Sequence, residues 1–197
     1  MTDPLRQTLK VYDEKAQTYT DMVAEFDDPA FEAFVADIPK GGHILDLGCG
    51  PGHVAARFAD QGFQVTALDG SAEMVRRAAA HPGVSARQAT FDEISGEDIY
   101  DGLWASFSLL HAPKSRFPHH LKALRRAARP GARLHLAMKL GDGEGPDSLG
   151  RYYAYYTQET LYDLLKQSGF SPKSHFTGTA PGLSGSNDPW IAIAAYA

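Results

Sequence analysis

The segment from His43 to His53, which reads HILDLGCGPGH, constrains the fold of this chain more than any other stretch. Its first half is a mostly aliphatic run, Ile44–Leu47, and its second half is rich in glycine. A short apolar run bounded by turn residues is typical of a buried parallel strand. Glycines at the carboxyl end of a strand let the backbone approach a ligand that a Cβ atom would exclude. The segment therefore predicts a strand followed by a ligand-binding turn.

A second apolar run, Val65–Leu68, ends in the acid Asp69. An acid in this position can accept hydrogen bonds from the two hydroxyl groups of a ribose. Parallel strands end at the same edge of a sheet, so the glycine turn and Asp69 together predict a nucleoside-binding crevice at that edge. The alternative is a structural turn with an unrelated acid downstream.

The spacing of the glycines indicates which nucleoside is bound. Gly48, Gly50 and Gly52 give the pattern G-x-G-x-G, whereas the dinucleotide fingerprint is G-x-G-x-x-G and a phosphate-binding P-loop needs a lysine after its glycines. With Asp46 as the preceding acid, the pattern resembles motif I of the class I S-adenosylmethionine-dependent methyltransferases, E/D-x-G-x-G-x-G. The resemblance implies that the chain binds S-adenosylmethionine and releases S-adenosylhomocysteine.

The same resemblance implies a set of cofactor contacts. The turn wraps the amino-acid end of the cofactor and Asp69 holds the ribose. Met74 is either an adenine contact or ordinary helix core, and Thr90 and Phe91 stand where the family often has an acid for the adenine amino group. The predicted cofactor-binding residues are Tyr19, Asp46, Gly48, Cys49, Gly50, Gly52, Asp69, Gly70, Ser71, Met74, Thr90, Phe91 and Ser106.

The candidate acceptor site lies in the second half of the chain. Lys139 ends a predicted strand, and a loop with four glycines, residues 141–150, leads to Arg151 and the four tyrosines of residues 152–156. The two cations could hold an anionic group, the tyrosines could form an aromatic wall, and the loop could act as a lid. The predicted substrate-binding residues are Lys139, Arg151, Tyr152 and Tyr155. Alternatively, the tyrosines fill the gap between the loop and the N-terminal helices.

Three further side chains have two interpretations each. His111 is predicted as a general base because histidine titrates near neutral pH, but it could also pack beneath the following loop. Tyr12 and Tyr19 lie seven residues apart and share one face of a predicted helix. They either cover the carboxylate of the cofactor or simply pack between helices.

Apolar runs alternate with amphipathic segments, which predicts an α/β doubly wound sheet. Strands are predicted at residues 43–47, 64–68, 84–88, 102–109, 132–140, 170–177 and 190–196. Helices are predicted at 9–26, 29–37, 53–61, from 71, 115–128 and 158–168. The resemblance implies a seven-stranded Rossmann-like sheet of order 3-2-1-4-5-7-6 with strand 7 antiparallel. We expect one domain over residues 1–197, with a helical cap at 1–40 and an α/β core at 41–197.

Composition sets further expectations. The net charge of −5 opposes a nucleic-acid partner, and the single cysteine excludes an internal disulfide and fits a reducing cytoplasm. No apolar run approaches the ~20 residues of a membrane span, and no signal peptide is evident. The eight histidines show no metal-ligand spacing, so we expect no metal. We expect a cytoplasmic monomer or homodimer.

The segments ASFSLLHAP, MKLGDGEG and RYYAYYT resemble a group of small bacterial methyltransferases, distantly similar to the tellurite-resistance methyltransferase. The predicted function is therefore metal-independent methyl transfer from S-adenosylmethionine to an unidentified small-molecule acceptor. A non-catalytic nucleoside-binding or regulatory protein is the first alternative. An NAD-dependent oxidoreductase is the second, although it needs the longer glycine spacing and an early first strand.

Overall fold

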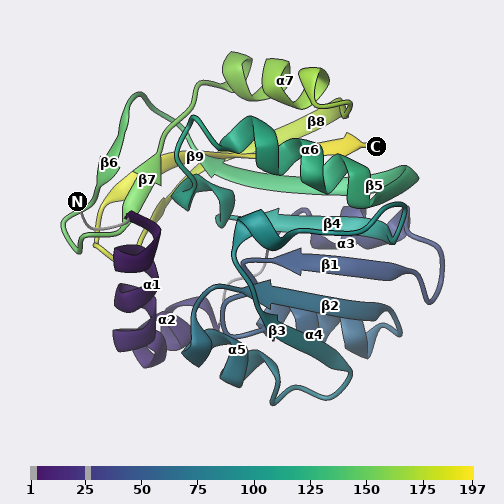
Figure 1. Cartoon of the computed structure of the whole chain (residues 1–197), viewed down its shortest axis with the longest axis horizontal. Helices are drawn as coiled ribbons and strands as arrows, with labels where there is room; N and C mark the ends of the chain where they lie inside the picture. The colour runs from purple at the N-terminus through teal and green to yellow at the C-terminus, as the bar shows by residue number, and fades with distance from the viewer. Residues whose placement is uncertain (1–3, 25–27) are drawn as a thin grey trace.

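The computed structural model describes residues 4–24 and 28–197, and a seven-stranded mixed sheet forms its centre (Figure 1). The strand order is β3-β2-β1-β4-β5-β9-β8, and β9 runs antiparallel to both of its neighbours. This confirms the predicted order, with β8 and β9 as the predicted strands six and seven. The strands of the sheet are β1 (His43–Leu47), β2 (Gln64–Asp69), β3 (Val84–Gln88), β4 (Tyr100–Ser106), β5 (Ala128–Lys139), β8 (Ser171–Pro181) and β9 (Asn187–Tyr196).

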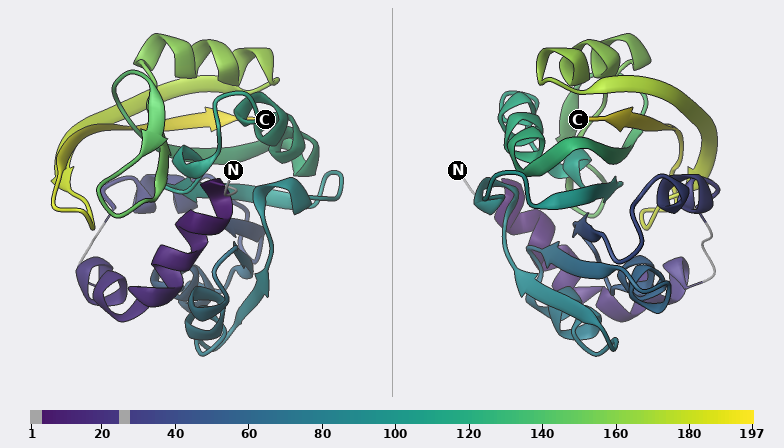
Figure 2. Two further views of the ribbon diagram at one scale, coloured as in Figure 1. Left: turned by 60° about the vertical axis from the view of Figure 1, so that its left-hand side comes forward. Right: turned by 90° about the vertical axis from the view of Figure 1, so that its right-hand side faces the viewer.

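Helices cover both faces of the sheet (Figure 2). Side chains of successive residues in a strand point to opposite faces, so Leu45 and Leu47 join one core cluster while Ile44 joins the other. The first cluster includes the apolar sides of α6 (Phe117–Ala127) and α7 (Gln158–Gln167). The second includes those of α3 (Phe31–Ala36), α4 (His53–Asp60) and α5 (Ala72–Ala78). Burial on both faces explains why the central strand β1 is mostly apolar, whereas the edge strands β3 and β8 are largely exposed and polar.

The N-terminal helices lie beside the carboxyl ends of the central strands (Figure 1). The predicted single helix of residues 9–26 is instead α1 (Pro4–Glu14) and α2 (Ala16–Val23). They are separated at Lys15, whose φ of −107° and ψ of 18° depart from helical geometry. The predicted helix end at residue 26 lies outside the described residues. Two short 3₁₀ turns, η1 (Phe91–Glu93) and η2 (Leu109–His111), follow β3 and β4.

The predicted glycine-rich lid contains regular structure. Within residues 141–150, β6 (Glu144–Pro146) pairs antiparallel with β7 (Tyr152–Ala154) in a separate two-stranded ribbon. The carboxylate of Asp147 accepts hydrogen bonds from the backbone N–H groups of Leu149 and Arg151, which fixes the connecting turn. The expected loop is therefore ordered as a strand at residues 144–146, while residues 141–143 and 147–150 form bends and turns.

The turn after β1 crosses the end of β2. The backbone N–H groups of Gly48 and Cys49 both donate to the carbonyl oxygen of Leu68. Gly52 ends the turn with a φ of +85°, and a Cβ atom there would lie 2.7 Å from the Cα atom of Ala78 in α5. This glycine is thus required both by backbone conformation and by the close approach of α5.

We expect Gly52→Ala to destabilise the fold more than Gly62→Ala. Both glycines have nearly equal φ angles, +85° and +86°, but a Cβ atom at Gly62 meets no atom within 4 Å. The left-handed conformation alone should cost roughly 1–2 kcal/mol at either position. The contact with Ala78 should add roughly 1–3 kcal/mol at Gly52, measured as the difference in the free energy of unfolding in urea. Equal losses for the two variants would show that α5 can move away at little cost.

Candidate active site

The carboxyl ends of β1, β2, β4 and β5 and the first residues of β9 meet at one edge of the sheet, where the chain forms two adjoining cavities. The larger cavity has a volume of about 180 Å³ and the smaller one about 60 Å³. Residues that line both cavities join them: Tyr12, Tyr19, Gly48, Gly50 and Phe107. An elongated ligand could therefore extend from one cavity into the other across the glycine turn.

The smaller cavity contains the predicted ribose-binding acid. Asp69 lines it together with Gly70, Met74 and Phe91. The Oδ2 atom of Asp69 accepts a hydrogen bond from the Gly50 N–H at 2.9 Å, and its Oδ1 atom accepts one from the Ser71 N–H at 2.8 Å. Burial raises the pKa of this carboxyl, and these N–H groups oppose the shift. Each carboxylate oxygen retains lone-pair capacity for a ligand hydroxyl.

Three predicted cofactor contacts line neither of the two cavities in the described part of the chain. Gly52 packs on α5, as described above. The hydroxyl of Ser71 caps α5 by accepting from the Met74 N–H, and it donates to Asp13. Thr90 forms a capping box with Glu93 at the start of η1. Hydroxyl groups before a helical turn commonly satisfy its free N–H groups, and these two do so here.

Asp46 is a buried acid with one free oxygen. It lines the larger cavity, its side chain is 3% exposed, and its Oδ2 atom has no hydrogen-bond partner among the described residues. Burial, with a contribution from Asp69, raises the pKa of Asp46 to about 8. An unpaired buried carboxyl is unfavourable unless a cation or a donor meets it. The larger cavity therefore suits a ligand that brings a positive charge to this oxygen.

Gly48 and Gly50 have different roles in the turn. A Cβ atom at Gly48 would lie 2.2 Å from the Cβ atom of Ser108, so this glycine is required by packing against the chain after β4. We expected it to make room for the ligand. Gly50 lines both cavities, and a Cβ atom there would lie 3.2 Å from the ring of Tyr19. Gly48 also lines both cavities, and Ser108 lines the smaller one, so a side chain at either glycine would meet a residue of the cavity walls.

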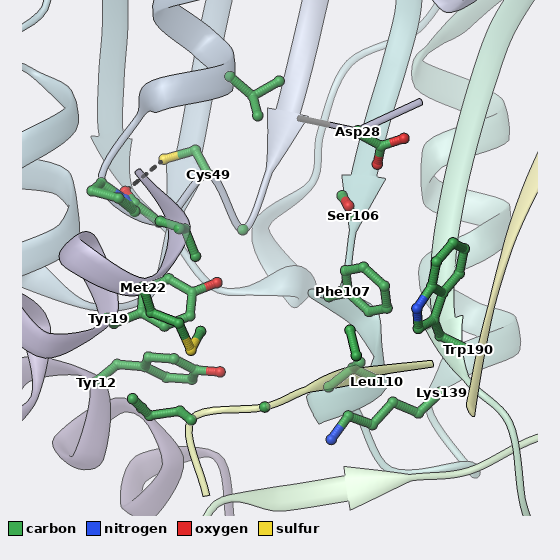
Figure 3. A pocket seen from close by; sticks show the side chains of 18 of the residues that line it. Tyr12, Tyr19, Met22, Asp28, Cys49, Ser106, Phe107, Leu110, Lys139 and Trp190 are labelled. Carbon is green, nitrogen blue, oxygen red and sulfur yellow. Dashed lines mark hydrogen bonds between the residues drawn. The ribbon is translucent and has the colours of Figure 1, made fainter. Parts of the chain in front are cut away.

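Phe107 stands between the two cavities in a rare backbone conformation. Its φ is +52°, one of two positive values among the described non-glycine residues, and its N–H donates to the carbonyl oxygen of Ala137. Its ring meets that of Trp190 edge-on, with centroids 6.0 Å apart (Figure 3). Such conformations are concentrated at functional sites. The sequence analysis did not single out Phe107, because no residue type signals a positive φ except glycine and, more weakly, asparagine or aspartate.

A hydrogen-bonded chain joins the N-terminal helix to the β6–β7 ribbon. Arg151 is 1% exposed; its Nε and Nη2 atoms donate to Asp147, and its Nη1 atom donates to the Tyr12 hydroxyl at 3.1 Å. The Tyr12 hydroxyl lies 2.9 Å from the Nε2 atom of His111, whose Nδ1 atom lies 2.6 Å from the Tyr152 carbonyl oxygen. A carbonyl only accepts, so Nδ1 must carry the proton and Nε2 accepts from Tyr12.

The hydrogen bonds from Arg151 through Tyr12 to His111 restrict the chemistry that His111 can perform. Burial lowers the pKa of His111 to about 4, so the imidazole is neutral near pH 7. Both of its nitrogens are engaged, and His111 lines only the smaller cavity, whereas Tyr12 lines both. Tyr12 therefore stands between His111 and the larger cavity. Burial also raises the pKa of Tyr12, which keeps its proton on the phenol.

The larger cavity receives the two predicted cations and only one of the tyrosines at residues 152–156. Lys139 and Arg151 line it, as do the predicted residues Tyr19, Cys49 and Ser106. The tyrosine is Tyr153, while Tyr152 and Tyr155 line neither cavity in the described chain. Side chains alternate along β7, so Tyr153 points inward when its neighbours do not.

The β8–β9 hairpin supplies a wall that the sequence analysis did not anticipate. Asp188 and Trp190, together with residues 180–183, line the larger cavity opposite the N-terminal tyrosines (Figure 3). Asp188 forms an ion pair with Lys139. The glycine- and serine-rich composition of this hairpin indicated a connection, and it gave no sign that the connection faces the site.

Residues 4–24 and 28–197 contain neither a cluster of metal ligands nor a membrane-spanning helix. No group of three histidine, cysteine, aspartate or glutamate side chains is arranged to hold a metal ion. No helix there is long and apolar enough to cross a membrane.

Comparisons with known proteins agree with this geometry. Residues 44–131 match a family model described as a methyltransferase domain. The chain is 32% identical over 147 residues to the O-methyltransferase resE of Aspergillus sclerotiorum, covering 66% of this chain and 55% of the relative. It is 29% identical over 197 residues to the O-methyltransferase cnsE of Penicillium expansum, covering 82% of this chain and 71% of the relative. The chain thus spans just over half the length of the first relative.

A solved structure shows the same fold over the whole chain. It is the 1,6-didemethyltoxoflavin-N1-methyltransferase of Burkholderia thailandensis with bound 1,6-didemethyltoxoflavin and S-adenosylhomocysteine. The TM-score is 0.77 at 22% sequence identity, and the match covers 100% of this chain and 91% of that one. At this identity the likeness concerns the fold.

We expect His111 to remain neutral throughout the physiological pH range. In ¹⁵N-histidine NMR spectra its two ring nitrogens should show a fixed Nδ1–H tautomer down to about pH 5, because the pKa is about 4. In urea the same residue should titrate near the ordinary value of about 6.5, which provides the control. Titration of His111 above pH 6 in the folded protein would contradict the hydrogen-bonded chain described above.

Proposed function

We propose that this chain, which belongs to the class I S-adenosylmethionine-dependent methyltransferases, transfers a methyl group to a small-molecule acceptor. One observation carries the proposal: the two cavities meet at the glycine turn, with Asp69 in one and the unpartnered oxygen of Asp46 in the other. A nucleoside joined to an amino acid matches this arrangement, with the ribose hydroxyls toward Asp69 and the ammonium group toward Asp46. A purely structural turn would explain Asp69, which holds the N–H groups of Gly50 and Ser71, but it would not explain the buried oxygen of Asp46 that has no partner in the described chain.

The residues present fit S-adenosylmethionine in detail. Asp69 would hold the ribose hydroxyls, Met74 and Phe91 would contact the adenine, and Asp46 would meet the positive charge of the amino-acid end. When bound, the cofactor supplies a methyl group already activated by a sulfonium. The protein then needs mainly to position the acceptor and to exclude water, and the tyrosines of α1 and α2 lie where they can do so.

The acceptor belongs to the larger cavity, which continues past the glycine turn to Lys139 and the β8–β9 hairpin. A cavity of this kind suits a small molecule, and the net charge of −5 opposes a nucleic-acid acceptor. We further propose a cytoplasmic enzyme that acts as a monomer or homodimer. Formation of S-adenosylhomocysteine from S-adenosylmethionine only when an acceptor is added tests the catalytic proposal. Binding without any turnover across a broad acceptor panel favours the non-catalytic alternative.

Asp69→Ala should weaken the binding of S-adenosylhomocysteine by about 10- to 150-fold in calorimetry. The variant loses charge-assisted hydrogen bonds to ribose that contribute roughly 1.5–3 kcal/mol. Asp69 also holds the N–H groups of Gly50 and Ser71, so the melting temperature of the variant must be measured as well.

Asp163→Ala, on the exposed side of α7, is the matched control and should bind like the unmodified protein. Unchanged affinity in a folded Asp69→Ala variant would remove Asp69 from the binding site. Tighter binding of NAD than of S-adenosylhomocysteine would support the oxidoreductase alternative instead.

Binding of S-adenosylhomocysteine at pH 7 should release close to one proton. Asp46, with a pKa of about 8, is mostly protonated in the free protein, and a neighbouring ammonium group favours the carboxylate. Affinity should therefore rise as the pH rises from about 6 to about 8. Calorimetry in two buffers of different ionisation enthalpy measures the proton count. Asp46→Asn, which cannot ionise, should bind more weakly and release no proton; release by this variant would assign the proton to another group.

A further inference from the structure

We propose that the methyl acceptor is an uncharged, planar aromatic compound, and that the ion pair of Lys139 and Asp188 binds the polar edge of its ring. The inference rests on the proposed function, because it concerns the acceptor end of the same cavity. It differs from the expectation that Lys139 and Arg151 hold an anionic group. Three features of the larger cavity carry it: its charge balance, its aromatic walls and the position of the ion pair.

The charge balance disfavours an anion. Both cationic side chains that line the larger cavity in the described chain have a carboxylate partner, Asp188 for Lys139 and Asp147 for Arg151. The histidine in the cavity wall, His53, has a pKa lowered to about 4 by burial and is neutral. An anionic acceptor would therefore meet no uncompensated positive side chain there.

The acidic side of the cavity adds to this effect. Asp28 and Asp46 also line it, and Asp46 has an oxygen without a partner. The cofactor's ammonium would meet Asp46, and Asp28 is paired with His135, so the positive group left for an acceptor would be the sulfonium, which S-adenosylhomocysteine lacks. An uncharged acceptor avoids the cost of desolvating a charge that no side chain compensates.

The walls of the acceptor end are aromatic. Phe107 and Trp190 meet at an interplanar angle of 90°, and Tyr153 lies nearby with Lys139 Nζ 4.5 Å from its ring centroid. The indole of Trp190 lies over Gly178 of the neighbouring strand, where a Cβ atom would come within 2.5 Å of it. Aromatic side chains in a cavity wall favour offset-stacked or edge-to-face contact with a further ring, which a saturated ring cannot make.

The ion pair lies beside this aromatic wall. Lys139 and Trp190 are direct partners across the β5–β9 register, and Asp188 precedes Trp190 by two residues. Lys139 is 9% exposed, and its ammonium has three donors, whereas Asp188 accepts from Lys139 and from the Ser186 hydroxyl. A donor and an acceptor therefore lie side by side, which matches a neutral edge that carries both, such as an amide or a carbonyl beside a hydroxyl.

The test compares three probes of nearly equal size: 4-hydroxybenzamide, 4-hydroxybenzoate and trans-4-hydroxycyclohexanecarboxamide. The protein is first saturated with S-adenosylhomocysteine, and binding of each probe is then measured by calorimetry and by quenching of tryptophan fluorescence. We expect the neutral aromatic amide to bind at least tenfold tighter than the anion and the saturated amide. Trp190→Phe should remove most of the quenching, because Trp190 stands at the acceptor end; Trp104, the other of the two tryptophans, also lines the larger cavity but is stacked on His135.

Variants of the ion pair provide a sharper test. Asp188→Asn leaves Lys139 without its carboxylate, so the preference for the amide over 4-hydroxybenzoate should fall at least tenfold. Lys139→Met leaves the carboxylate alone and should weaken 4-hydroxybenzoate still further. Asp163→Asn is the control for loss of a surface charge and should change neither ratio. All three variants should bind S-adenosylhomocysteine within about threefold of the unmodified protein.

Two outcomes overturn the inference while leaving the proposed function intact. In both, S-adenosylhomocysteine binds normally. In the first, 4-hydroxybenzoate or the saturated amide binds as tightly as 4-hydroxybenzamide, and in the second none of the three probes binds. Failure of the protein to bind S-adenosylhomocysteine at all is a different result, because it contradicts the proposed function itself.

Discussion

The carboxylate of Asp69 is the interaction on which the geometry of the site depends. It accepts one backbone N–H from the glycine turn after β1 and one from the start of the helix after β2, so a single side chain sets the distance between two neighbouring turns. Leu68 adds to this junction by accepting from Gly48 and Cys49 through its carbonyl oxygen. Because these turns form the boundary between the two cavities, the same acid that would hold the ribose also shapes the space around it.

The charged side chains of the larger cavity differ in whether they have a partner of opposite charge. Arg151 and Lys139 are each neutralised by a carboxylate, so their charges serve to hold the β6–β7 ribbon and the β8–β9 hairpin in place. Asp46 has no such partner in the described chain. Burial without a partner disfavours the charged form of an acid, so Asp46 is mostly protonated near pH 7 in the free protein. A ligand that brings an ammonium group to this position, beside the glycine turn, would favour the carboxylate.

The sequence predicted those parts of the fold and site that depend on local pattern. Apolar runs and glycine spacing indicated the strands and the glycine turn, and the position of Asp69 indicated its place at the crevice, because each follows from a few adjacent residues. The strand order came from the family resemblance. Contacts between distant segments could not be predicted in this way. The pairing of Asp188 with Lys139 and the bond from Arg151 to Tyr12 join residues 49 and 139 positions apart. Tyr153 lines the larger cavity and Tyr152 does not, because side chains alternate along β7. The pairing of β7 with β6 could not be predicted, since the glycine-rich sequence of β6 does not resemble a strand.

The antiparallel last strand explains how the acceptor end is built. A parallel strand at the position of β9 would end, and not begin, at the edge of the sheet where the site lies. The residues at its start, and the turn before it, would then lie at the opposite edge. Because β9 runs in the opposite direction, its first residues lie beside the end of β5, and the turn from β8 stands at the same edge. Asp188 and Trp190 thereby meet Lys139 within one hairpin. Changes in this hairpin can alter the acceptor end while Asp69 and the glycine turn, on the central strands, keep the cofactor end unchanged.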